Sequence, residues 1–424
     1  MHKEKNKFKR ILWIVLTLLV LTLTGSTLYL QWYALEAGGN ERGKDLETSY
    51  AFMYEHYPFL SHWVDSLQRE NALRDTFILA EDGVRLHALY LYADTLTAHT
   101  AVAVHGYTDN AVRMLHIAYL YNHDLHYNVL LPDLRFAGQS EGDHIQMGWK
   151  DRLDVLRWME VANELFAPEG SQTRMVVHGI SMGAATTVCV SGEPQPPFVN
   201  CFVEDCGYTS VWDEYAGELK NQFGLPAFPL LHLASWATRL RYGWDFREAS
   251  PLEQVKKCRL PMLFIHGTED TFVPTWMGDS LYVAKTGIKE IWHVEGATHA
   301  DSYLKYAKEY TEIVKSFVER YNIPKDMNNL PKPVNKVCHE ESFLSVPLIL
   351  CMPERTTPVC RHVYGGQPAY GLFAGQDQAC GQSRWNPFRT DRTANGQPAI
   401  SVGNGEGRTV RGSRSGTYRR RRML

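Results

Sequence analysis

The first residue with the context for catalysis is Ser181, which stands in the sequence Gly-Ile-Ser-Met-Gly at positions 179–183. An apolar run at 175–177 precedes it and a run of small and apolar residues at 184–190 follows it, so the pattern predicts a strand, a sharp turn and a helix. In that context the turn lifts the serine hydroxyl above the strand end, and the helix start offers backbone N–H groups to an anion. The segment therefore predicts a nucleophilic serine that attacks an acyl carbonyl group.

A base and an acid for this serine are predicted downstream, because a serine hydroxyl is a poor nucleophile until an oriented base removes its proton. Asp270 lies in the segment HGTEDTFVP at 266–274, directly after a predicted strand. His299 ends the segment EGATH at 295–299, which follows the next predicted strand. We therefore expect Ser181, Asp270 and His299 to act as nucleophile, acid and base.

Other assignments of the acid, and any metal site, have less support. Asp205, at the end of an earlier predicted strand, is the alternative position for the acid, whereas Glu269 should point away from the base. No pair among the 17 histidines forms an HExxH pattern, and none of the eight cysteines belongs to a CxxC pair. The sequence thus predicts no metal and no cofactor. Cys201 and Cys206 fall on opposite faces of one predicted strand, so no disulfide is expected between them.

Residues 76–321 resemble the α/β-hydrolase superfamily, and within it the serine aminopeptidase-like group of small-lid hydrolases and esterases. The resemblance rests on the serine turn, the two loops that carry Asp270 and His299, HGYTDN at 105–110, and DLRFAGQSEG at 133–142. The last block is similar to the family's pattern DxRGxGxSxG, but Phe136 replaces its first glycine, so this loop is expected to turn differently. The chain order serine, aspartate, histidine is also the order that this architecture uses.

The resemblance implies an oxyanion hole and a reaction. The backbone N–H groups of Met182 and Tyr107 would bind the oxyanion, Ser181 would form an acyl-enzyme from an ester or amide, and water activated through His299 would release the acid. A carboxylesterase or lipase is the favoured interpretation. One alternative is a peptidase that releases N-terminal residues, which would need an acidic cluster for the substrate amine. The other is a membrane-tethered binding protein that keeps the fold without turnover.

A largely parallel sheet must position these residues. From about residue 73 to 322, short apolar runs alternate with amphipathic helical segments, a pattern typical of strands joined by crossover helices. We predict an α/β-hydrolase fold with a mostly parallel eight-stranded sheet flanked by helices, opened by a hairpin about Asp82 and Gly83. The aromatic-rich insertion at about 207–257 predicts a small helical lid. The predicted strands are 75–79, 84–92, 100–104, 127–131, 174–177, 198–204, 261–265 and 290–294.

The N-terminus carries a candidate transmembrane helix. Residues 1–10 form a basic flank, and residues 11–30 contain no charged side chain. As a helix, the uncharged run is about 30 Å long, enough to cross the hydrocarbon core of a bilayer. Trp32 and two neighbouring tyrosines fit an interfacial belt, and the basic flank predicts a cytoplasmic N-terminus with the catalytic domain outside. A cleaved secretory signal is the alternative. Residues 31–72 are expected to form a juxtamembrane segment with one or two short helices.

The C-terminal part differs from the rest in composition and charge. Residues 323–424 lack periodicity and are rich in Gly, Pro, Ser, Gln and Arg, which predicts a disordered basic tail or the product of a shifted reading frame. Residues 325–424 hold 15 Lys and Arg against 7 Asp and Glu, an excess of eight positive charges. Because the whole chain carries −3, the remainder carries −11, which argues against a nucleic-acid-binding core. The expected partners are a small ester or amide and the membrane.

Overall fold

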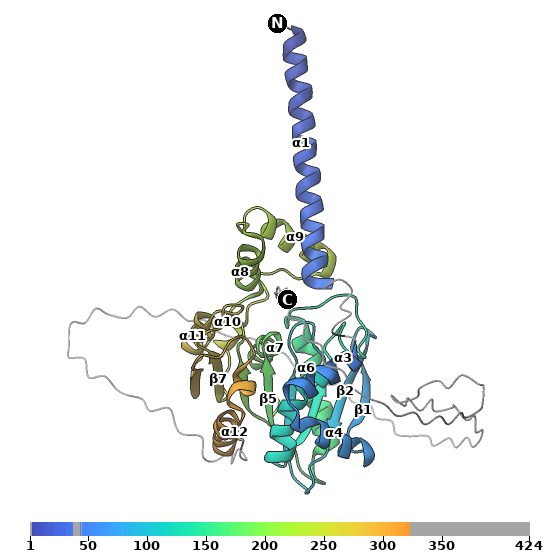
Figure 1. Cartoon of the computed structure of the whole chain (residues 1–424), viewed down its shortest axis with the longest axis vertical. Coiled ribbons are helices and arrows are strands. Elements are labelled where there is room, and N and C mark those ends of the chain that lie inside the picture. The colour runs from blue at the N-terminus through green and yellow to red at the C-terminus, as the bar shows by residue number, and fades with distance from the viewer. Residues whose placement is uncertain (1, 37–42, 44, 323–424) are drawn as a thin grey trace, which may run out of the picture. The chain divides into compact units, whose positions relative to one another are not determined.

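The computed structural model describes residues 2–36, 43 and 45–322 (Figure 1). The tail predicted at 323–424 lies outside the described residues. One eight-stranded sheet has the order β1-β2-β4-β3-β5-β6-β7-β8. The strands are β1 Arg74–Leu79, β2 Arg85–Leu91, β3 His99–Val104, β4 Asn128–Pro132, β5 Arg174–Ile180, β6 Val199–Asp205, β7 Met262–Gly267 and β8 Lys289–Val294.

This sheet confirms the predicted fold. β1 and β2 form the opening hairpin, β2 pairs antiparallel with β4, and every pair from β4 to β8 is parallel. The hairpin turn needs Gly83, whose φ of +83° is a conformation that side chains with a Cβ rarely adopt. The parallel strands point their carboxyl ends to one edge of the sheet, where the loops after β5, β7 and β8 lie.

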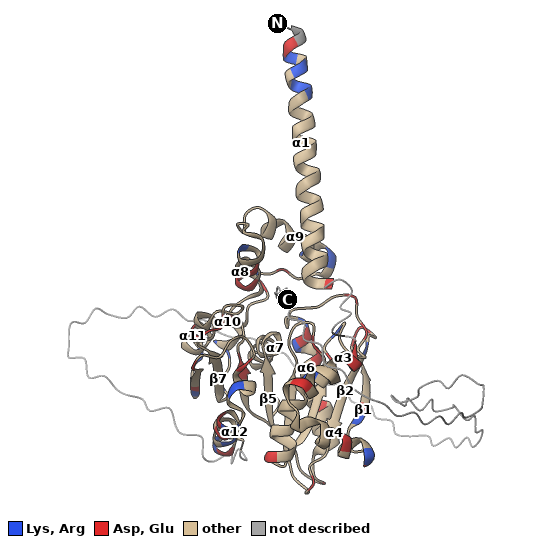
Figure 2. Ribbon diagram, in the orientation of Figure 1, with Lys and Arg blue, Asp and Glu red and all other residues tan. Residues whose placement is uncertain are grey.

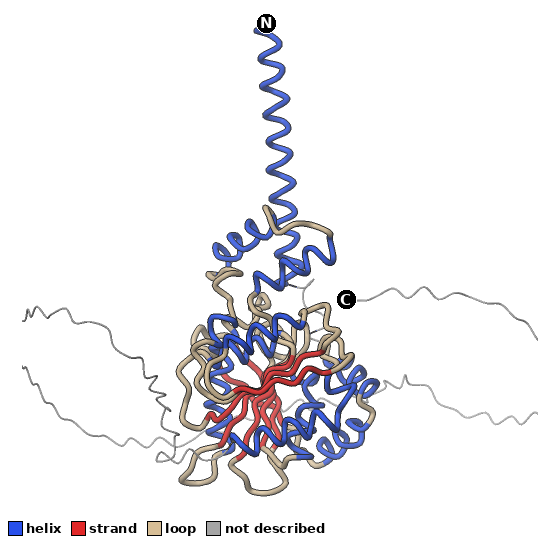
Figure 3. The backbone as a smooth tube through the Cα atoms, turned by 90° about the vertical axis from the view of Figure 1, so that its left-hand side faces the viewer, coloured by secondary structure: helices blue, strands red, loops and turns tan. Residues whose placement is uncertain are grey.

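Helices cover both faces of the sheet, as the view in Figure 3 shows. Side chains alternate along each strand, so in β3 Val102 and Val104 enter one apolar core while Ala101 and Ala103 enter the other. The first core is closed by α6 Asp151–Phe166, α7 Met182–Ser191, α10 Pro251–Val255 and α11 Thr275–Ala284. The second is closed by α3 Leu46–His56, α4 Phe59–Arg69, α5 Leu115–Tyr119 and α12 Ser302–Tyr321, with the short turns η3 Ala111–Met114 and η4 Leu120–Asp124 beside α5.

The insertion between β6 and α10 folds into two helices joined by a short loop. We call this insertion the lid. Its helices are α8 Val211–Phe223 and α9 Leu230–Tyr242. α8 begins where the Ser210 side chain accepts a hydrogen bond from the Asp213 amide, and both helices end at a left-handed glycine, Gly224 and Gly243. Local sequence signals therefore fix the ends of both lid helices.

The N-terminal segment forms α1 His2–Gln31, which continues as a π-helical turn, η1 Trp32–Glu36. Figure 2 shows its basic end and the uncharged stretch that follows. Among the described residues α1 with its extension is the one helix long and apolar enough to cross a membrane, with a mean hydropathy of 2.2 in its most apolar window. Length and composition of this kind are shared by membrane anchors and signal sequences.

The C-terminal end of this helix is packed on the lid, which the sequence did not predict. Thr27, Gln31 and Leu35 recur on one face and are buried, whereas residues 11–22 are exposed. Gln31 Nε2 donates to Thr238 Oγ1 in α9 at 3.3 Å, and Tyr242 OH donates to Glu36 Oε1 at 3.1 Å. The segment predicted as a juxtamembrane linker therefore starts as part of the folded domain, and its two short helices are α3 and α4.

Candidate active site

Ser181 occupies a strained turn between β5 and α7. Its φ of 58° and ψ of −121° lie in a region that non-glycine residues seldom adopt, and such strain is typical of functional positions. A Cβ added to Gly179 would lie 2.0 Å from the Gly183 carbonyl oxygen, and one added to Gly183 would lie 2.0 Å from the Val104 carbonyl oxygen. The two glycines flanking the serine are therefore required for strand β5, helix α7 and the end of β3 to meet this closely.

The three residues predicted to act together are brought into one hydrogen-bonded line. Ser181 Oγ lies 2.8 Å from His299 Nε2, although the two residues are 118 positions apart. His299 Nδ1 lies 2.7 Å from Asp270 Oδ2. Asp270 follows β7 and His299 follows β8, so neighbouring parallel strands deliver both side chains to the edge where β5 ends. This arrangement can move a proton from the serine hydroxyl to the imidazole while the carboxylate orients the ring.

The surroundings of Asp270 keep it ionised. The backbone amides of Phe272 and Val273 both donate to Asp270 Oδ1 at 3.0 Å, and the carboxyl group is fully buried. Burial alone would raise the pKa of Asp270, but hydrogen bonds from His266 and His299 outweigh it and lower the pKa to about 2. At neutral pH the carboxylate is therefore charged and accepts a hydrogen bond from His299 Nδ1.

The two residues predicted to bind an oxyanion, Met182 and Tyr107, lie in segments beside Ser181. Met182 is the first residue of α7, where backbone N–H groups have no partner within the helix. The loop after β3 lies beside Ser181, because a Cβ added to Gly106 would come within 3.5 Å of Ser181 Cβ. Tyr107 is the next residue in that loop. Its side chain turns away from the serine, and its hydroxyl donates to the Ala34 carbonyl oxygen at 2.9 Å.

Comparison with known proteins places the chain in a family. The sequence model of the prolyl oligopeptidase family matches residues 135–320. YqkD of Bacillus subtilis (strain 168), named as an uncharacterized protein, is 32% identical over 226 residues, which cover 53% of this chain and 73% of YqkD. The α/β-hydrolase domain-containing protein WAV2 of Arabidopsis thaliana is 26% identical over 256 residues, covering 58% of this chain and 79% of WAV2. The chain belongs to the α/β-hydrolase superfamily.

This family membership confirms the resemblance found in the sequence. Among solved structures, the α/β hydrolase is similar to the esterase Pf2001 of Pyrococcus furiosus, at 22% identity and a TM-score of 0.48 over 59% of this chain and 91% of the esterase.

In this α/β hydrolase the alternative acid, Asp205, is engaged elsewhere. Its carboxylate accepts hydrogen bonds from Tyr310 OH at 3.0 Å and from Ser302 Oγ at 3.4 Å, and burial raises its pKa to about 6. Its backbone carbonyl accepts the Ser181 amide at 2.8 Å. Asp205 therefore supports the serine turn through its main chain, while Asp270 is the carboxylate on the histidine. Glu269 is exposed to solvent.

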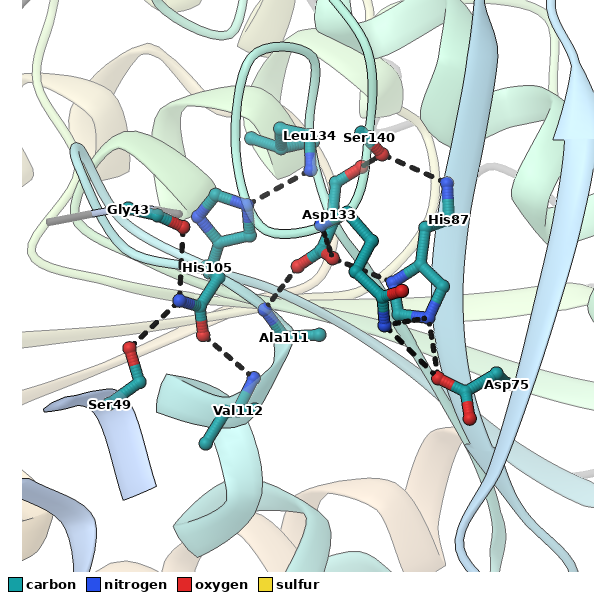
Figure 4. A network of polar contacts seen from close by, with 12 residues as sticks. Gly43, Ser49, Asp75, His87, His105, Ala111, Val112, Asp133, Leu134 and Ser140 are labelled. Atoms are coloured by element: carbon teal, nitrogen blue, oxygen red, sulfur yellow. Dashed lines mark hydrogen bonds and ion pairs between the residues drawn. The ribbon is translucent and has the colours of Figure 1, made fainter. Parts of the chain in front are cut away.

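A second polar network holds the loop at 133–142, the block in which Phe136 departs from the family pattern (Figure 4). Asp133 Oδ1 accepts the Ala111 amide at 2.6 Å, and Oδ2 accepts the Gln139 amide at 2.9 Å. His87 Nδ1 lies 2.6 Å from Asp133 Oδ2, and its Nε2 lies 2.9 Å from Asp75 Oδ1. Phe136 takes the left-handed conformation, with φ of 64°, that the family's glycine adopts without strain.

The hydrolase should lose stability as pH rises because of His87. Burial alone would lower the pKa of this imidazole, but the hydrogen bonds that it donates to the carboxylates of Asp133 and Asp75 outweigh it and raise the pKa to about 9. A folded-state pKa above the ordinary value of 6.5 contributes stability that is complete below pH 6.5 and lost as pH rises through 9. We expect His87 to contribute about 2 kcal/mol to the free energy of unfolding at low pH, since Asp75 is half exposed and screened.

Urea unfolding of the full chain in detergent, followed below pH 6.5 and above pH 9, measures this difference. His87→Asn should flatten the decline. His126→Asn is the matched control, because His126 also bonds an aspartate but both side chains are exposed. An unchanged decline in His87→Asn would show that another group causes it.

Three buried cysteines are thiols, as expected: Cys189, Cys206 and Cys258 are free. Cys201 is also buried. The Cys206 sulfur and the ligand atoms of Asp270 and His299 lie within 4.8 Å of one another. Two of these three groups are already hydrogen-bonded to each other, so we assign no resident metal to this cluster.

Proposed function

We propose that this α/β hydrolase is a serine hydrolase that cleaves carboxylic esters, or amides, through an acyl-enzyme. In this proposal Ser181 is the nucleophile, His299 the general base and Asp270 the acid that orients it. The observation that carries the proposal is the hydrogen-bonded line from Ser181 Oγ through the imidazole of His299 to Asp270 Oδ2, at 2.8 Å and 2.7 Å. No cofactor takes part in this mechanism.

The reaction begins when Ser181 Oγ attacks the substrate carbonyl carbon and its proton passes to His299 Nε2. The carbonyl oxygen becomes an oxyanion, which the amides of Met182 and Tyr107 stabilise by roughly 3 kcal/mol each. His299 then protonates the leaving alcohol or amine. Water attacks the acyl-enzyme, gives a proton to His299, and the carboxylic acid leaves as Ser181 regains its proton. Asp270, ionised throughout because its pKa is about 2, stabilises the imidazolium.

Esters of acyl chains are the favoured substrate class. A peptidase needs an accessible carboxylate at the substrate amine, and the two acidic side chains at the end of β6 are buried: Glu204 accepts the Gly207 amide, and Asp205 accepts a hydrogen bond from Tyr310. The lid above the strand ends is rich in aromatic and aliphatic side chains. An apolar wall of this kind suits a hydrocarbon chain better than a charged peptide terminus.

A peptidase acting at a free N-terminus is the second candidate, and one feature of the lid favours it. α8 carries Glu214 and Glu218, whose carboxyl groups are in electrostatic range of Asp270 and His299 respectively. Burial raises the pKa of both, and a substrate ammonium group beside either carboxyl would favour its anion. Cleavage of aminoacyl arylamides in preference to nitrophenyl esters, abolished in Glu218→Gln, would favour this candidate.

Labelling of the full chain with a fluorophosphonate probe tests the proposed function. We expect the wild type to be labelled and Ser181→Ala to be unlabelled, because only an activated serine attacks the phosphorus atom at a useful rate. Ser280→Ala is the control, since Ser280 bonds its own helix through the Trp276 carbonyl. A folded wild-type protein that takes no label would support instead the reading of a membrane-tethered binding protein.

We also propose that α1 is an uncleaved anchor whose basic end stays in the cytoplasm, which puts the catalytic domain outside. A cleaved secretory signal is the alternative. The intact mass of the purified protein separates the two, because cleavage near Gly25 would remove most of the apolar run.

A further inference from the structure

We propose that the lid tip docks into the same bilayer surface that α1 enters, so that the active site receives an amphipathic acyl ester from that leaflet. The lid tip is defined as Phe223, Leu225, Phe228 and Trp236. The inference rests on the proposed serine-hydrolase function and on α1 as an anchor, and it adds the source and class of the substrate.

The lid tip exposes large apolar side chains next to one another. Phe228 and Trp236 have 72% and 63% of their surface exposed, and Phe223 and Leu225 are also exposed. Phe228 precedes α9, and its ring centroid lies 5.6 Å from that of His232, which is one turn before Trp236 on the exposed side of the helix. The opposite side of α9, with Leu231, Ala234 and Thr238, is buried. Single exposed apolar residues are ordinary, but several that lie together mark an interaction surface.

The register between the two helices sets how deep the lid tip lies. Gln31 bonds Thr238, and four residues further along α9 Tyr242 bonds Glu36, so α9 runs in the same direction as α1. The start of α9 at Leu230 therefore lies on the side of Thr238 that is toward the N-terminus of α1. Tyr33 adds a second link, because its ring meets Phe223 edge-on at 6.1 Å and its hydroxyl donates to Gln222 at 3.2 Å.

The length of the free part of α1 requires the lid tip to reach the membrane. Residues 11–22 are exposed, and as a helix they span only about 18 Å. The hydrocarbon core of a bilayer is about 30 Å thick, so α1 must use its apolar run up to about Leu30 to cross it. Thr27 and Gln31, at the end of that run, are the residues already packed against α9. The lid tip therefore lies at the bilayer surface, where it contacts lipid as well as water.

Charge follows the same order along the lid. Arg239 and Arg241 stand at the end of α9 away from the lid tip, level with Glu36, which Arg241 meets at 2.8 Å. Apolar groups at one end and arginines at the other match the change from acyl chains to headgroups across a bilayer surface. Exposed Tyr29 and Trp32 of α1 add aromatic rings at the same level.

The same contacts connect the membrane surface to the candidate active site. Tyr215 of α8 and Tyr107 both direct their hydroxyl groups to the Ala34 carbonyl oxygen, at 3.4 Å and 2.9 Å. The residue proposed to supply an oxyanion-hole amide is thus held by the end of the membrane helix. A substrate whose acyl chain stays in the leaflet would reach Ser181 without crossing bulk water.

Depth-dependent quenching tests the docking itself, without reference to catalysis. The full chain carries Phe228→Cys with an environment-sensitive fluorophore, in a background where the tail cysteines at 338, 351, 360 and 380 are serine, and is placed in phosphatidylcholine nanodiscs. We expect doxyl-labelled lipid to quench the fluorophore at least about twofold. Leu96→Cys, in a loop where Leu96 is fully exposed, is the matched control and should be unquenched. Equal, weak quenching at both positions would overturn the docking.

Substrate presentation tests the delivery. Phe228→Ser with Trp236→Ser should lower hydrolysis of a long-chain ester in phosphatidylcholine vesicles about tenfold and leave that of a short water-soluble ester unchanged. An equal effect on both esters, or none on either, would overturn delivery from the leaflet. Fluorophosphonate labelling of Ser181 distinguishes a failure of the proposed function from a failure of this inference. A chain that takes no label contradicts the proposed function, whereas a labelled chain without quenching at position 228 contradicts only this inference.

Discussion

Replacing His299 with alanine is expected to slow the phosphonylation of Ser181, and the hydrolysis of any ester the wild type cleaves, by about a millionfold. The reason is the 2.8 Å contact between His299 Nε2 and Ser181 Oγ, which supplies the only base in hydrogen-bonding reach of the serine among the contacts of the described residues. Asp270→Asn should cost about ten thousandfold, because an amide can hold the imidazole in the wrong tautomer. Rates are measured on the full chain in detergent with a fluorophosphonate probe.

The matched control for this substitution is His293→Ala. His293 lies on β8 in the same region of sequence, but it is exposed and pairs with exposed Asp279 at 2.7 Å. Its loss should change the rate by no more than about twofold, since exposed ion pairs contribute little. A His299→Ala protein that reacts at the wild-type rate would refute the assignment of the base. A loss of rate in Asp205→Asn as large as that in Asp270→Asn would assign the role of the acid to Asp205 instead.

The second large effect is expected from Gly183→Ala, a change of one methyl group. The new Cβ would lie 2.0 Å from the Val104 carbonyl oxygen and 2.7 Å from that of His105, and neither backbone atom can rotate away. α7 and the end of β3 must move apart, which we expect to lower the free energy of unfolding by about 3 kcal/mol. The same movement separates Ser181 from the loop that carries Tyr107, so the labelling rate should fall as well.

Thermal unfolding followed by tryptophan fluorescence measures the loss of stability, expected as a decrease of about 8 °C in Tm. Gly217→Ala is the control, because Gly217 lies within α8 with no heavy atom near its missing Cβ. Alanine there should raise stability by up to about 1 kcal/mol through its helix propensity. A Gly183→Ala protein with wild-type Tm and labelling rate would contradict the proposed reason for the glycine.

The residues around Ser181 could be predicted because each depends on short-range rules. A glycine on either side of a serine, after an apolar run, specifies a tight turn whatever the rest of the chain does. Asp270 and His299 each follow a strand whose apolar run is visible in the sequence, and parallel strands bring such loops to one edge. The eight strands, the family and the lid insertion follow from the same local signals.

Contacts between distant segments could not be predicted, because nothing local requires them. The hydrogen bond from Tyr107 to Ala34 joins residues 73 positions apart, and neither residue type indicates which partner it has. The packing of α1 on α9 depends on Thr27, Gln31 and Leu35. In the sequence these are ordinary residues within an apolar run or just after it. One missed site had a signal: His87 shares its side of β2 with buried Leu89 and Leu91, and a histidine in an apolar phase needs polar partners.

The order of strands also has a consequence for when the protein becomes active during its synthesis. His299 follows β8, which pairs with β7 at the edge of the sheet formed by the described residues, and it meets a serine made 118 residues earlier. Contacts of such long sequence separation form slowly and late in folding. A nascent or truncated chain that ends before β8 would hold the serine turn and the lid but no base. Under the proposed mechanism, hydrolysis therefore starts only when the last strand has joined the sheet, and unfinished chains do not hydrolyse the substrate.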